Sequence, residues 1–260
     1  MKPETGTIIL LDVGNSNTRV CFSTGDRILG RKMVSAPTDL FFSRRFLMNA
    51  AGAMKDKGFE RVVACCVVPK QVPKIRRFAR RLTGKEPLFV RGGMDLGIRI
   101  RYPNRRQIGA DRLANAVGAR RLYGAPAIVV DFGTAVTFDV VNARGEYVGG
   151  VIAPGLSAMT DYLYEHTALL PRVELREPRS PVGKSTVDAM RVGAVLGYRG
   201  LVKEILAALR RERGLKGAVA IATGGYGDLI ARKVREIDHV NPLLTMEGLR
   251  FIYLRKVTGT

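Results

Sequence analysis

The sequence predicts an α/β protein built of two similar domains with a cleft between them, and three observations support this fold class. Apolar, strand-like runs alternate with helical stretches along the whole chain, which is typical of α/β architecture. A strand–turn–strand unit that contains Asp-x-Gly occurs near residue 12 and again near residue 131. The chain has 260 residues, enough for two domains of ordinary size, and we expect them to be 1–124 and 125–260.

In the first half, the pattern predicts an antiparallel meander followed by a helix, a buried strand and a second helix. Residues 7–13 are apolar and β-branched and end at a glycine, and residues 18–23 alternate. Residues 61–68 are apolar on both faces, which suits a parallel strand. The expected strands are 7–13, 18–23, 27–34, 61–68 and 87–90, and the expected helices are about 38–57, 70–83 and 110–123.

The second half repeats this order of elements. The run 127–132 is apolar and ends at Gly133, and a further buried run at 218–222 precedes a glycine pair. The expected strands are 127–132, 135–141, 146–152 and 218–222, and the expected helices are about 155–165, 186–212, 226–235 and 243–255.

The repeat places Asp-x-Gly at equivalent positions, in residues 12–18 and again in residues 131–137. Glycine and small polar residues at a hairpin tip let backbone N–H groups approach a phosphate. An Asp at the strand end can hold Mg²⁺ through water. A single copy reads most simply as an ordinary turn. Two copies in two half-chains favour a pair of hairpins that clamps a triphosphate.

Other motifs narrow the chemistry. The segment 182–186, Val-Gly-Lys-Ser-Thr, is not a P-loop, because Pro178 stands where the first glycine is required. We expect Ser185 or Thr186 to cap the helix that follows. Asp111 beside Arg112 at a helix start can pair a general base with an anion anchor, or can simply satisfy free amides. The glycine pair after Thr223 fits close approach of a ligand or a tight turn.

Composition and charge exclude several classes of protein. Lys and Arg number 43 against 23 Asp and Glu, a formal net charge of +20 that favours anionic ligands. No stretch reaches the roughly 18 apolar residues of a membrane span, so no membrane association is expected. The three cysteines show no metal or disulfide spacing, and Cys65 and Cys66 read as core residues. We expect a cytoplasmic protein without a zinc site.

These motifs together resemble the type III pantothenate kinase family, within the acetate and sugar kinase, Hsc70 and actin superfamily. Gly-x-Asp-Arg, Thr-Ala-Leu-Leu-Pro and Gly-Lys-x-Thr in this order are more specific than the Asp-x-Gly hairpins. Cys65 and Cys66 depart from the family, which often has Ser there. The matching segments are 11–18, 67–69, Tyr102, 109–112, 131–137, 149–155, 167–171, 183–186, 223–225, 241–249 and 252–253.

The resemblance implies two actin-like, ribonuclease H-like domains and the phosphorylation of pantothenate by ATP with Mg²⁺, the first step towards coenzyme A. It implies that Asp111 is the catalytic base, and that Thr186 reaches the substrate of the neighbouring subunit in a homodimer. Asp131 would hold K⁺ or NH₄⁺, and Asp12 would hold Mg²⁺ through water. The other implied pantothenate-binding residues are Tyr102, Gly109, Ala110 and Arg112. The implied ATP-binding residues are Asp12, Val13, Gly14, Asn15, Ser16, Asn17, Thr18, Arg19 and Thr134.

Two alternatives stay open at this stage. One is a kinase of the same fold that acts on another small alcohol. The other is a catalytically weak relative that regulates through nucleic acid, which the positive charge permits. Aromatic residues are only 7% and Trp is absent, so nucleic-acid binding is not expected. The intact Asp12, Asp111 and Asp131 favour an enzyme.

Overall fold

The computed structural model describes residues 6–41 and 58–259, and the chain divides into two compact units. The first unit comprises Met1–Arg121 together with Leu243–Thr260, and the second comprises Leu122–Pro242. The boundary expected after residue 124 lies close to the first junction. It differs for residues 243–260, which the sequence analysis put in the second domain and which belong to the first unit.

The first unit is organised around a sheet in the order β3-β2-β1-β4-β5. β1 and β2 are antiparallel, as are β2 and β3, whereas β4 runs parallel to β1 and β5 runs parallel to β4. β1 lies in the middle because its side chains are buried on both faces. The strands are β1 (Thr7–Val13), β2 (Asn17–Ser23), β3 (Ile28–Pro37), β4 (Phe59–Cys66) and β5 (Leu88–Phe89).

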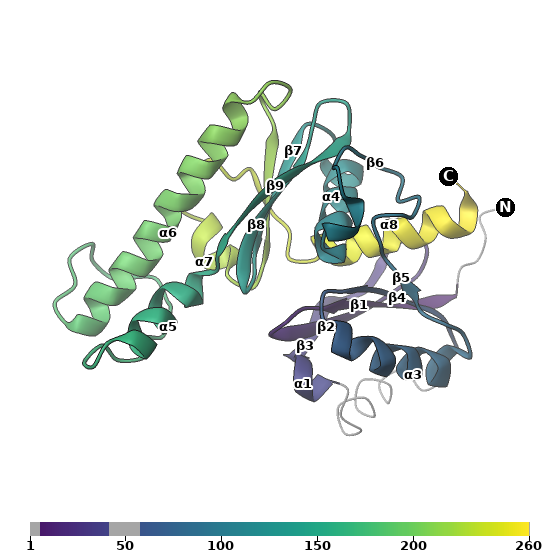
Figure 1. Cartoon of the computed structure of the whole chain (residues 1–260), viewed down its shortest axis with the longest axis horizontal. Coiled ribbons are helices and arrows are strands. Elements are labelled where there is room, and N and C mark those ends of the chain that lie inside the picture. The colour runs from purple at the N-terminus through teal and green to yellow at the C-terminus, as the bar shows by residue number, and fades with distance from the viewer. Residues whose placement is uncertain (1–5, 42–57, 260) are drawn as a thin grey trace. The chain divides into compact units, whose positions relative to one another are not determined.

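Helices cover this sheet, as Figure 1 shows for α3. Ile75 and Ala79 of α3 pack into the sheet's core, and the basic side chains of this helix lie on its other faces. Of the helix expected over 38–57, the structure describes only α1, and residues 42–57 lie outside the described residues. The remaining elements before the second unit are α1 (Thr38–Phe41), η1 (Pro69–Gln71), α3 (Val72–Thr83), β6 (Arg99–Ile100), η2 (Arg105–Gln107) and α4 (Ala110–Tyr123).

The C-terminal helix α8 (Leu244–Thr258) belongs to the first unit because its contacts lie there. Thr245 Oγ1 donates a hydrogen bond of 2.7 Å to Oδ1 of Asn115 on α4. Nη1 of Arg250 donates to the carbonyl oxygen of Gly25 at 2.9 Å. The apolar residues of α8 that are fully buried are Leu244, Leu249 and Ile252. Contacts between such distant positions leave no local pattern in the sequence.

The second unit repeats the first. Within it the strand order is β9-β8-β7-β10-β11, with β7, β8 and β9 antiparallel, β10 parallel to β7 and β11 parallel to β10. The strands are β7 (Ala127–Phe132), β8 (Ala135–Val141), β9 (Glu146–Pro154), β10 (Val219–Gly224) and β11 (His239–Val240). The helices are α5 (Leu156–His166), α6 (Thr186–Arg211) and α7 (Gly227–Ala231).

Backbone hydrogen bonds confirm that the two units are copies of one arrangement. The residue after β4 binds the end of β1, through Val67 N and the carbonyl oxygen of Val13 at 3.1 Å. In the second unit, the end of β7 is bound from the loop after β10, where Tyr226 N, two residues beyond the strand, donates to the carbonyl oxygen of Phe132 at 3.3 Å. Since strand order, strand direction and these loop contacts all recur, the internal repeat read from the sequence is confirmed.

The second hairpin is one residue shorter than the first. Asp12 faces Arg19 across its hairpin, whereas Asp131 faces Thr137. The aligned segments 12–18 and 131–137 therefore match structurally at their aspartates, but they are out of register by one residue on the second strand of each hairpin. Among helices of the described part of the chain, none is long and apolar enough to span a membrane.

Candidate active site

The hairpin between β1 and β2 presents a polar tip on a braced base. Gly14 N donates a hydrogen bond of 3.0 Å to the carbonyl oxygen of Asn17, closing the turn. Thr38 Oγ1 donates to the carbonyl oxygen of Gly14 at 2.7 Å, and the backbone N–H of Thr38 donates to the carbonyl oxygen of Ser16 at 3.0 Å. Asn15, Ser16 and Asn17 are exposed. Small polar residues on a fixed turn suit the binding of an anion.

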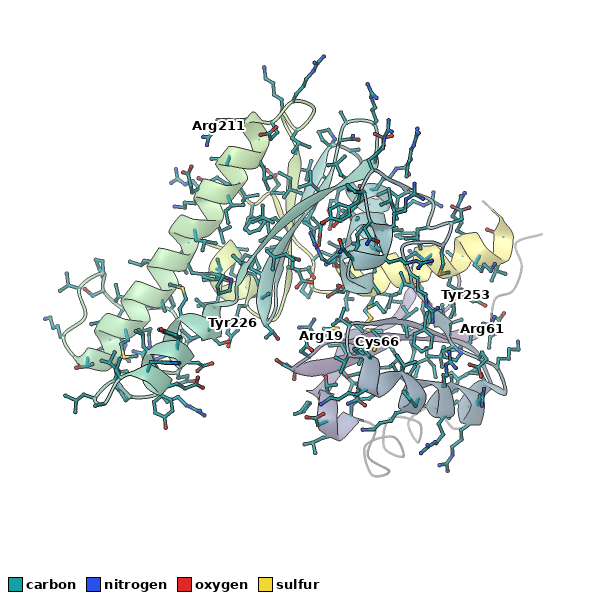
Figure 2. All side chains as sticks on the ribbon, in the orientation of Figure 1. Arg19, Arg61, Cys66, Arg211, Tyr226 and Tyr253 are labelled. Carbon is teal, nitrogen blue, oxygen red and sulfur yellow. The ribbon has the colours of Figure 1, made fainter. Side chains whose placement is uncertain are left out.

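Asp12 lies in β1, two residues before Gly14 of the turn, and is only 8% exposed. Its neighbours on both adjacent strands bind its carboxylate. Nη1 of Arg19 lies 3.3 Å from Oδ2, and the thiol of Cys65 donates to Oδ1 at 3.3 Å. These contacts follow from the registers of β1 with β2 and of β1 with β4. Figure 2 shows Arg19 and Cys66 at one end of the sheet, with Arg61 at the opposite end.

Asp111 lies in the first turn of α4, and its carboxylate Oδ1 accepts a hydrogen bond of 2.8 Å from the backbone N–H of Arg112. Burial raises the pKa of the Asp111 carboxyl, opposed by this hydrogen bond and by the charge of Arg112. The pKa of Cys65 is raised by its burial, and then by the charges of Asp12 and Asp111. Asp111 therefore shares one electrostatic environment with Asp12 and Cys65.

Gly109 makes room for the Asp111 carboxylate. A Cβ atom at this position would collide with Oδ1 of Asp111. Any larger residue would have to displace the carboxylate or the backbone that carries it. Glycine is thus required at position 109, because the Asp111 carboxylate lies so close to the backbone there.

The hairpin between β7 and β8 has its own carboxylate and glycine. Gly133 N donates to the carbonyl oxygen of Ala135 at 3.1 Å, and Thr134 is exposed at the tip. Gly224 follows Thr223 with a φ of 88°, and a Cβ there would lie 2.5 Å from Oδ1 of Asp131. Only glycine fits, both because of this backbone conformation and because of the nearby carboxylate.

The predicted site residues are divided between the two units. Asp12, the first hairpin and residues 109–112 lie in the first unit, and Asp131 and Thr134 lie together in the second. Val13 and Thr18 are fully buried, and the Thr18 hydroxyl lies 3.1 Å from that of Thr38, so neither side chain is open to a ligand. Tyr102 is half-buried in the segment before α4.

Thr186 is the first residue of α6 and is exposed. Ser185 is the cap, since its Oγ accepts a hydrogen bond of 3.1 Å from the backbone N–H of Asp188. Gly183 packs so closely on α6 that a Cβ would lie 2.5 Å from the Cα of Ala189. The glycine of Gly-Lys-Ser-Thr therefore fixes the path of the chain into the helix.

Sequence reasoning did not assign a role at the site to Cys65 or Thr38. Cys65 sits in an apolar run and reads as a core residue. Its contact with Asp12 depends on the register of two parallel strands that are far apart in sequence. Thr38 carried no signal beyond its place at a helix start.

The sequence profile of the type III pantothenate kinase family matches residues 8–208. The chain belongs to the type III pantothenate kinase family. A type III pantothenate kinase of Akkermansia muciniphila is 48% identical over 244 residues, which cover 94% of this chain and 97% of that protein. Those of Methylacidiphilum infernorum and Moorella thermoacetica are 42% and 39% identical, over 94% and 95% of this chain and 87% and 99% of theirs.

Solved structures show that this pantothenate kinase family member has the actin-like fold. A Campylobacter jejuni protein described as a Baf family transcriptional activator has a TM-score of 0.60 and 19% identity, covering 96% of this chain and 98% of its own. The ROK hexokinase of Thermus thermophilus has a TM-score of 0.52 and 16% identity, covering 98% and 100%. Likenesses at this level of identity concern the fold alone.

Kinases of this family use ATP with a divalent metal ion, and the residues of the first unit fit both. The exposed hairpin tip offers backbone and amide groups to phosphates. Among the described residues, no group of three or more His, Cys, Asp or Glu side chains that could hold a metal ion occurs. Asp12 at the hairpin base would suit a hydrated Mg²⁺, which prefers carboxylate oxygens and water as ligands.

Proposed function

We propose that this chain transfers the γ-phosphoryl group of ATP to the primary hydroxyl of pantothenate, the first step of coenzyme A biosynthesis. The observation that carries the proposal is the Asp111 carboxylate, held at the start of α4 by the Arg112 N–H beside a glycine that leaves it room. Family membership supports the choice of pantothenate.

In this proposal Asp111 accepts the proton of the pantothenate hydroxyl as its oxygen attacks phosphorus. Burial raises the pKa of Asp111 and so makes the carboxylate a better proton acceptor than an exposed one. Arg112 binds the pantothenate carboxylate, since a guanidinium matches it with two parallel hydrogen bonds. Tyr102, Gly109 and Ala110 complete the pantothenate subsite.

Residues 12–19, together with Thr134, bind the ATP phosphates. Phosphoryl transfer depends mostly on positioning and charge neutralisation, which the polar hairpin and Arg19 supply. A divalent ion held through water at Asp12 would neutralise charge on the phosphates. The burial of Val13 and Thr18 restricts them to backbone contributions.

A monovalent cation, K⁺ or NH₄⁺, is proposed at Asp131. The Asp131 carboxylate lies beside Gly224. Because Gly224 has no side chain, the carboxylate oxygen and the nearby backbone stay accessible. Large monovalent cations prefer several oxygen ligands of low charge density, and one carboxylate among backbone carbonyls offers such a set.

We further propose a homodimer that forms through the second unit. Exposed on α6 are Gly193, Leu196, Gly197 and Gly200, a stripe of one apolar and three small residues that permits close approach of another helix. Ile152 of β9 and Tyr162 of α5 are each 62% exposed. Exposed apolar groups on three elements of one unit favour contact with a second copy. Thr186 would then reach the partner's pantothenate.

The remaining alternatives have less support. The likeness to the Baf structure is one of fold, at 19% identity, and carries no assignment to transcription. The three free thiols fit the cytoplasm, where we place the protein.

The direct test measures ADP formation by the purified protein with Mg²⁺, ATP and pantothenate, with and without K⁺. We expect ADP only when pantothenate is present, and faster formation with K⁺. The matched control is Asp111→Asn, which should be nearly inactive. ADP formation that is independent of pantothenate, or a preference for another alcohol in a substrate panel, would overturn the assignment.

A further inference from the structure

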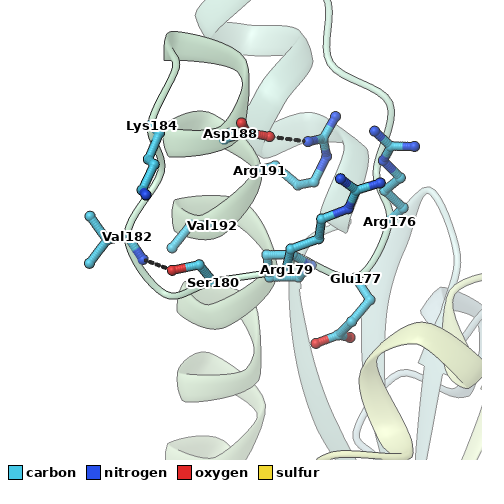
Figure 3. Close-up of a pocket in the computed structure, with 10 residues that line it drawn as sticks. Arg176, Glu177, Arg179, Ser180, Val182, Lys184, Asp188, Arg191 and Val192 are labelled. Atoms are coloured by element: carbon cyan, nitrogen blue, oxygen red, sulfur yellow. Dashed lines mark hydrogen bonds and ion pairs between the residues drawn. The ribbon is translucent and has the colours of Figure 1, made fainter.

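The second unit contains a pocket of about 420 Å³ between the segment 176–184 and the first turns of α6 (Figure 3). The charged residues that line it are four cations and two acids. The cations are Arg176, Arg179, Lys184 and Arg191, and the acids are Glu177 and Asp188. This volume lies within the range of small-molecule sites.

Both acidic residues of the wall are already neutralised. Glu177 binds Arg199 through two hydrogen bonds, of 3.1 and 2.5 Å, and Lys233 at 3.1 Å. The Arg199 guanidinium holds the pKa of Glu177 below its usual range. Asp188 accepts hydrogen bonds from Ser185 Oγ at 2.9 Å and from Nη1 of Arg191 at 2.6 Å. These carboxylates leave little negative charge for the other cations of the pocket.

Of the four cationic side chains in the pocket wall, Arg191 is paired with Asp188, and the other three have no carboxylate partner among the described residues. Arg191 is 6% exposed and fixed, with Nε donating to the carbonyl oxygen of Glu174 at 3.1 Å. Figure 3 shows the guanidinium groups of Arg176 and Arg179 at the same end of the pocket as that of Arg191. Within the described ranges, Arg176, Arg179 and Lys184 form no ion pair. Like charges that share one cavity repel each other, and a multivalent anion between them removes that repulsion.

We propose that this pocket binds a phosphorylated small molecule through its phosphate groups. Guanidinium groups bind phosphate oxygens in pairs, and a buried arginine held by its own neighbours is prepared for this without reordering. The pocket is larger than one phosphate needs, and its apolar wall, Val182 and Val192, leaves space for a carbon skeleton. The inference concerns the second unit alone and does not depend on the kinase activity.

The test is calorimetric titration with pyrophosphate and with inorganic phosphate, on the whole protein without nucleotide. We expect pyrophosphate to bind more tightly than phosphate. Arg176→Ala and Arg179→Ala should each weaken pyrophosphate binding about tenfold or more, the typical effect of losing a charge-assisted hydrogen bond. Both side chains are exposed, so their loss leaves the core intact.

Arg172→Ala is the matched control, because Arg172 precedes the segment 176–184 by four residues and lies outside the pocket, with its guanidinium over the Tyr164 ring. It should bind pyrophosphate like the unaltered protein. Equal affinity in all four proteins would overturn the proposal, since it would assign the binding to another site. A loss of self-association in Arg179→Ala, by sedimentation, with unchanged pyrophosphate affinity would overturn it in favour of an acidic group of a second copy.

Discussion

The thiol of Cys65 donates a hydrogen bond to Oδ1 of Asp12 across two parallel strands, with Sγ and Oδ1 3.3 Å apart. Burial raises the pKa of this thiol, so it keeps its proton at neutral pH and acts as a donor. On the other side of the carboxylate, Arg19 lies 3.3 Å from Oδ2. The orientation of Asp12 is thus set from both neighbouring strands.

Cys65→Ala should weaken the use of Mg·ATP, because Asp12 loses the donor on one side. A thiol is a weak donor, and a typical hydrogen bond contributes about 0.5–1.5 kcal/mol, so kcat/KM for Mg·ATP should fall about 2–10-fold. The KM for pantothenate should change little. Steady-state kinetics at varied Mg·ATP measure both quantities.

Two variants control that experiment. Cys65→Ser keeps a donor and should restore most of the activity. Cys66→Ala removes the neighbouring thiol, which donates to the carbonyl oxygen of Val68 at 3.3 Å, and should leave the kinetics unchanged. If Cys65→Ser is as impaired as Cys65→Ala, the contact is one of packing rather than of orientation.

Asp111→Asn should lower the rate of phosphoryl transfer about 10²–10⁴-fold, the usual effect of losing a general base. The same variant should not lower the melting temperature. Since burial raises the pKa of Asp111, the folded protein holds its proton more tightly than the unfolded chain. Stability from this group is therefore present at low pH and lost as pH rises through the folded pKa. A neutral amide avoids that loss at pH 7.

The same pKa shift predicts the pH profile of the unaltered enzyme. In the proposed mechanism, transfer needs the ionised carboxylate of Asp111, so kcat should fall on the acid side, around a pKa above the ordinary aspartate value of 3.8. Kinetics between pH 4 and pH 8 measure this limb. An acid limb at or below the ordinary value would argue against Asp111 as the base.

Gly109→Ala should reduce kcat sharply without unfolding the protein. The added Cβ would collide with Oδ1 of Asp111 and push the carboxylate from its hydrogen bond with the Arg112 N–H. Gly93→Ala is the control, because nothing lies within 4 Å of a Cβ there. The comparison uses kcat and the circular dichroism melting curve of both variants. Equal activity would show that the glycine is not needed for the carboxylate.

Gly224→Ala and Gly214→Ala separate the effect of backbone strain from that of a collision. Both glycines have positive φ angles, of 88° and 86°, but only Gly224 has neighbours, among them Asp131 Oδ1 at 2.5 Å. Gly214→Ala should cost about 1–2 kcal/mol from the left-handed conformation alone. Gly224→Ala should cost more in a denaturant melt and should also weaken K⁺ activation. Equal destabilisation of the two variants, with intact K⁺ activation, would argue against a cation site at the Asp131 carboxylate.

Subunit mixing tests the homodimer and the role of Thr186. Asp111→Asn and Thr186→Ala subunits should each be impaired alone, the second by about 0.5–1.5 kcal/mol for one lost hydrogen bond. In a mixed dimer, one site combines Asp111 of one chain with Thr186 of the other, so part of the activity should return. A fully active monomer by light scattering, or no recovery after proven exchange, contradicts the shared site.

The sequence predicted most elements because their signals are local. The strands at 7–13, 127–132 and 135–141 have the expected bounds, since apolar β-branched runs end there at glycine turns. β6 and β11 were not expected, because each has only two residues and depends on its partner strand for pairing.

What the sequence could not predict depends on distant contacts. The placement of α8 requires knowing that Thr245 meets Asn115, and the contact of Cys65 with Asp12 requires the register of β1 with β4. The one-residue difference between the two hairpins is also invisible in the aligned letters. The roles of the individual site residues stay predictions until the variants are measured.

The return of the chain to the first unit through α8 has a consequence for synthesis in the cell. The core of the first unit stays incomplete until α8 leaves the ribosome, after the whole second unit has been made. At about 5–20 residues per second, this delay is on the order of ten seconds. Through that interval the nascent first sheet lacks one of its covering helices. A premature stop before residue 243 should therefore produce a chaperone-bound or degraded product, even though that product contains Asp12, Cys65 and Asp111.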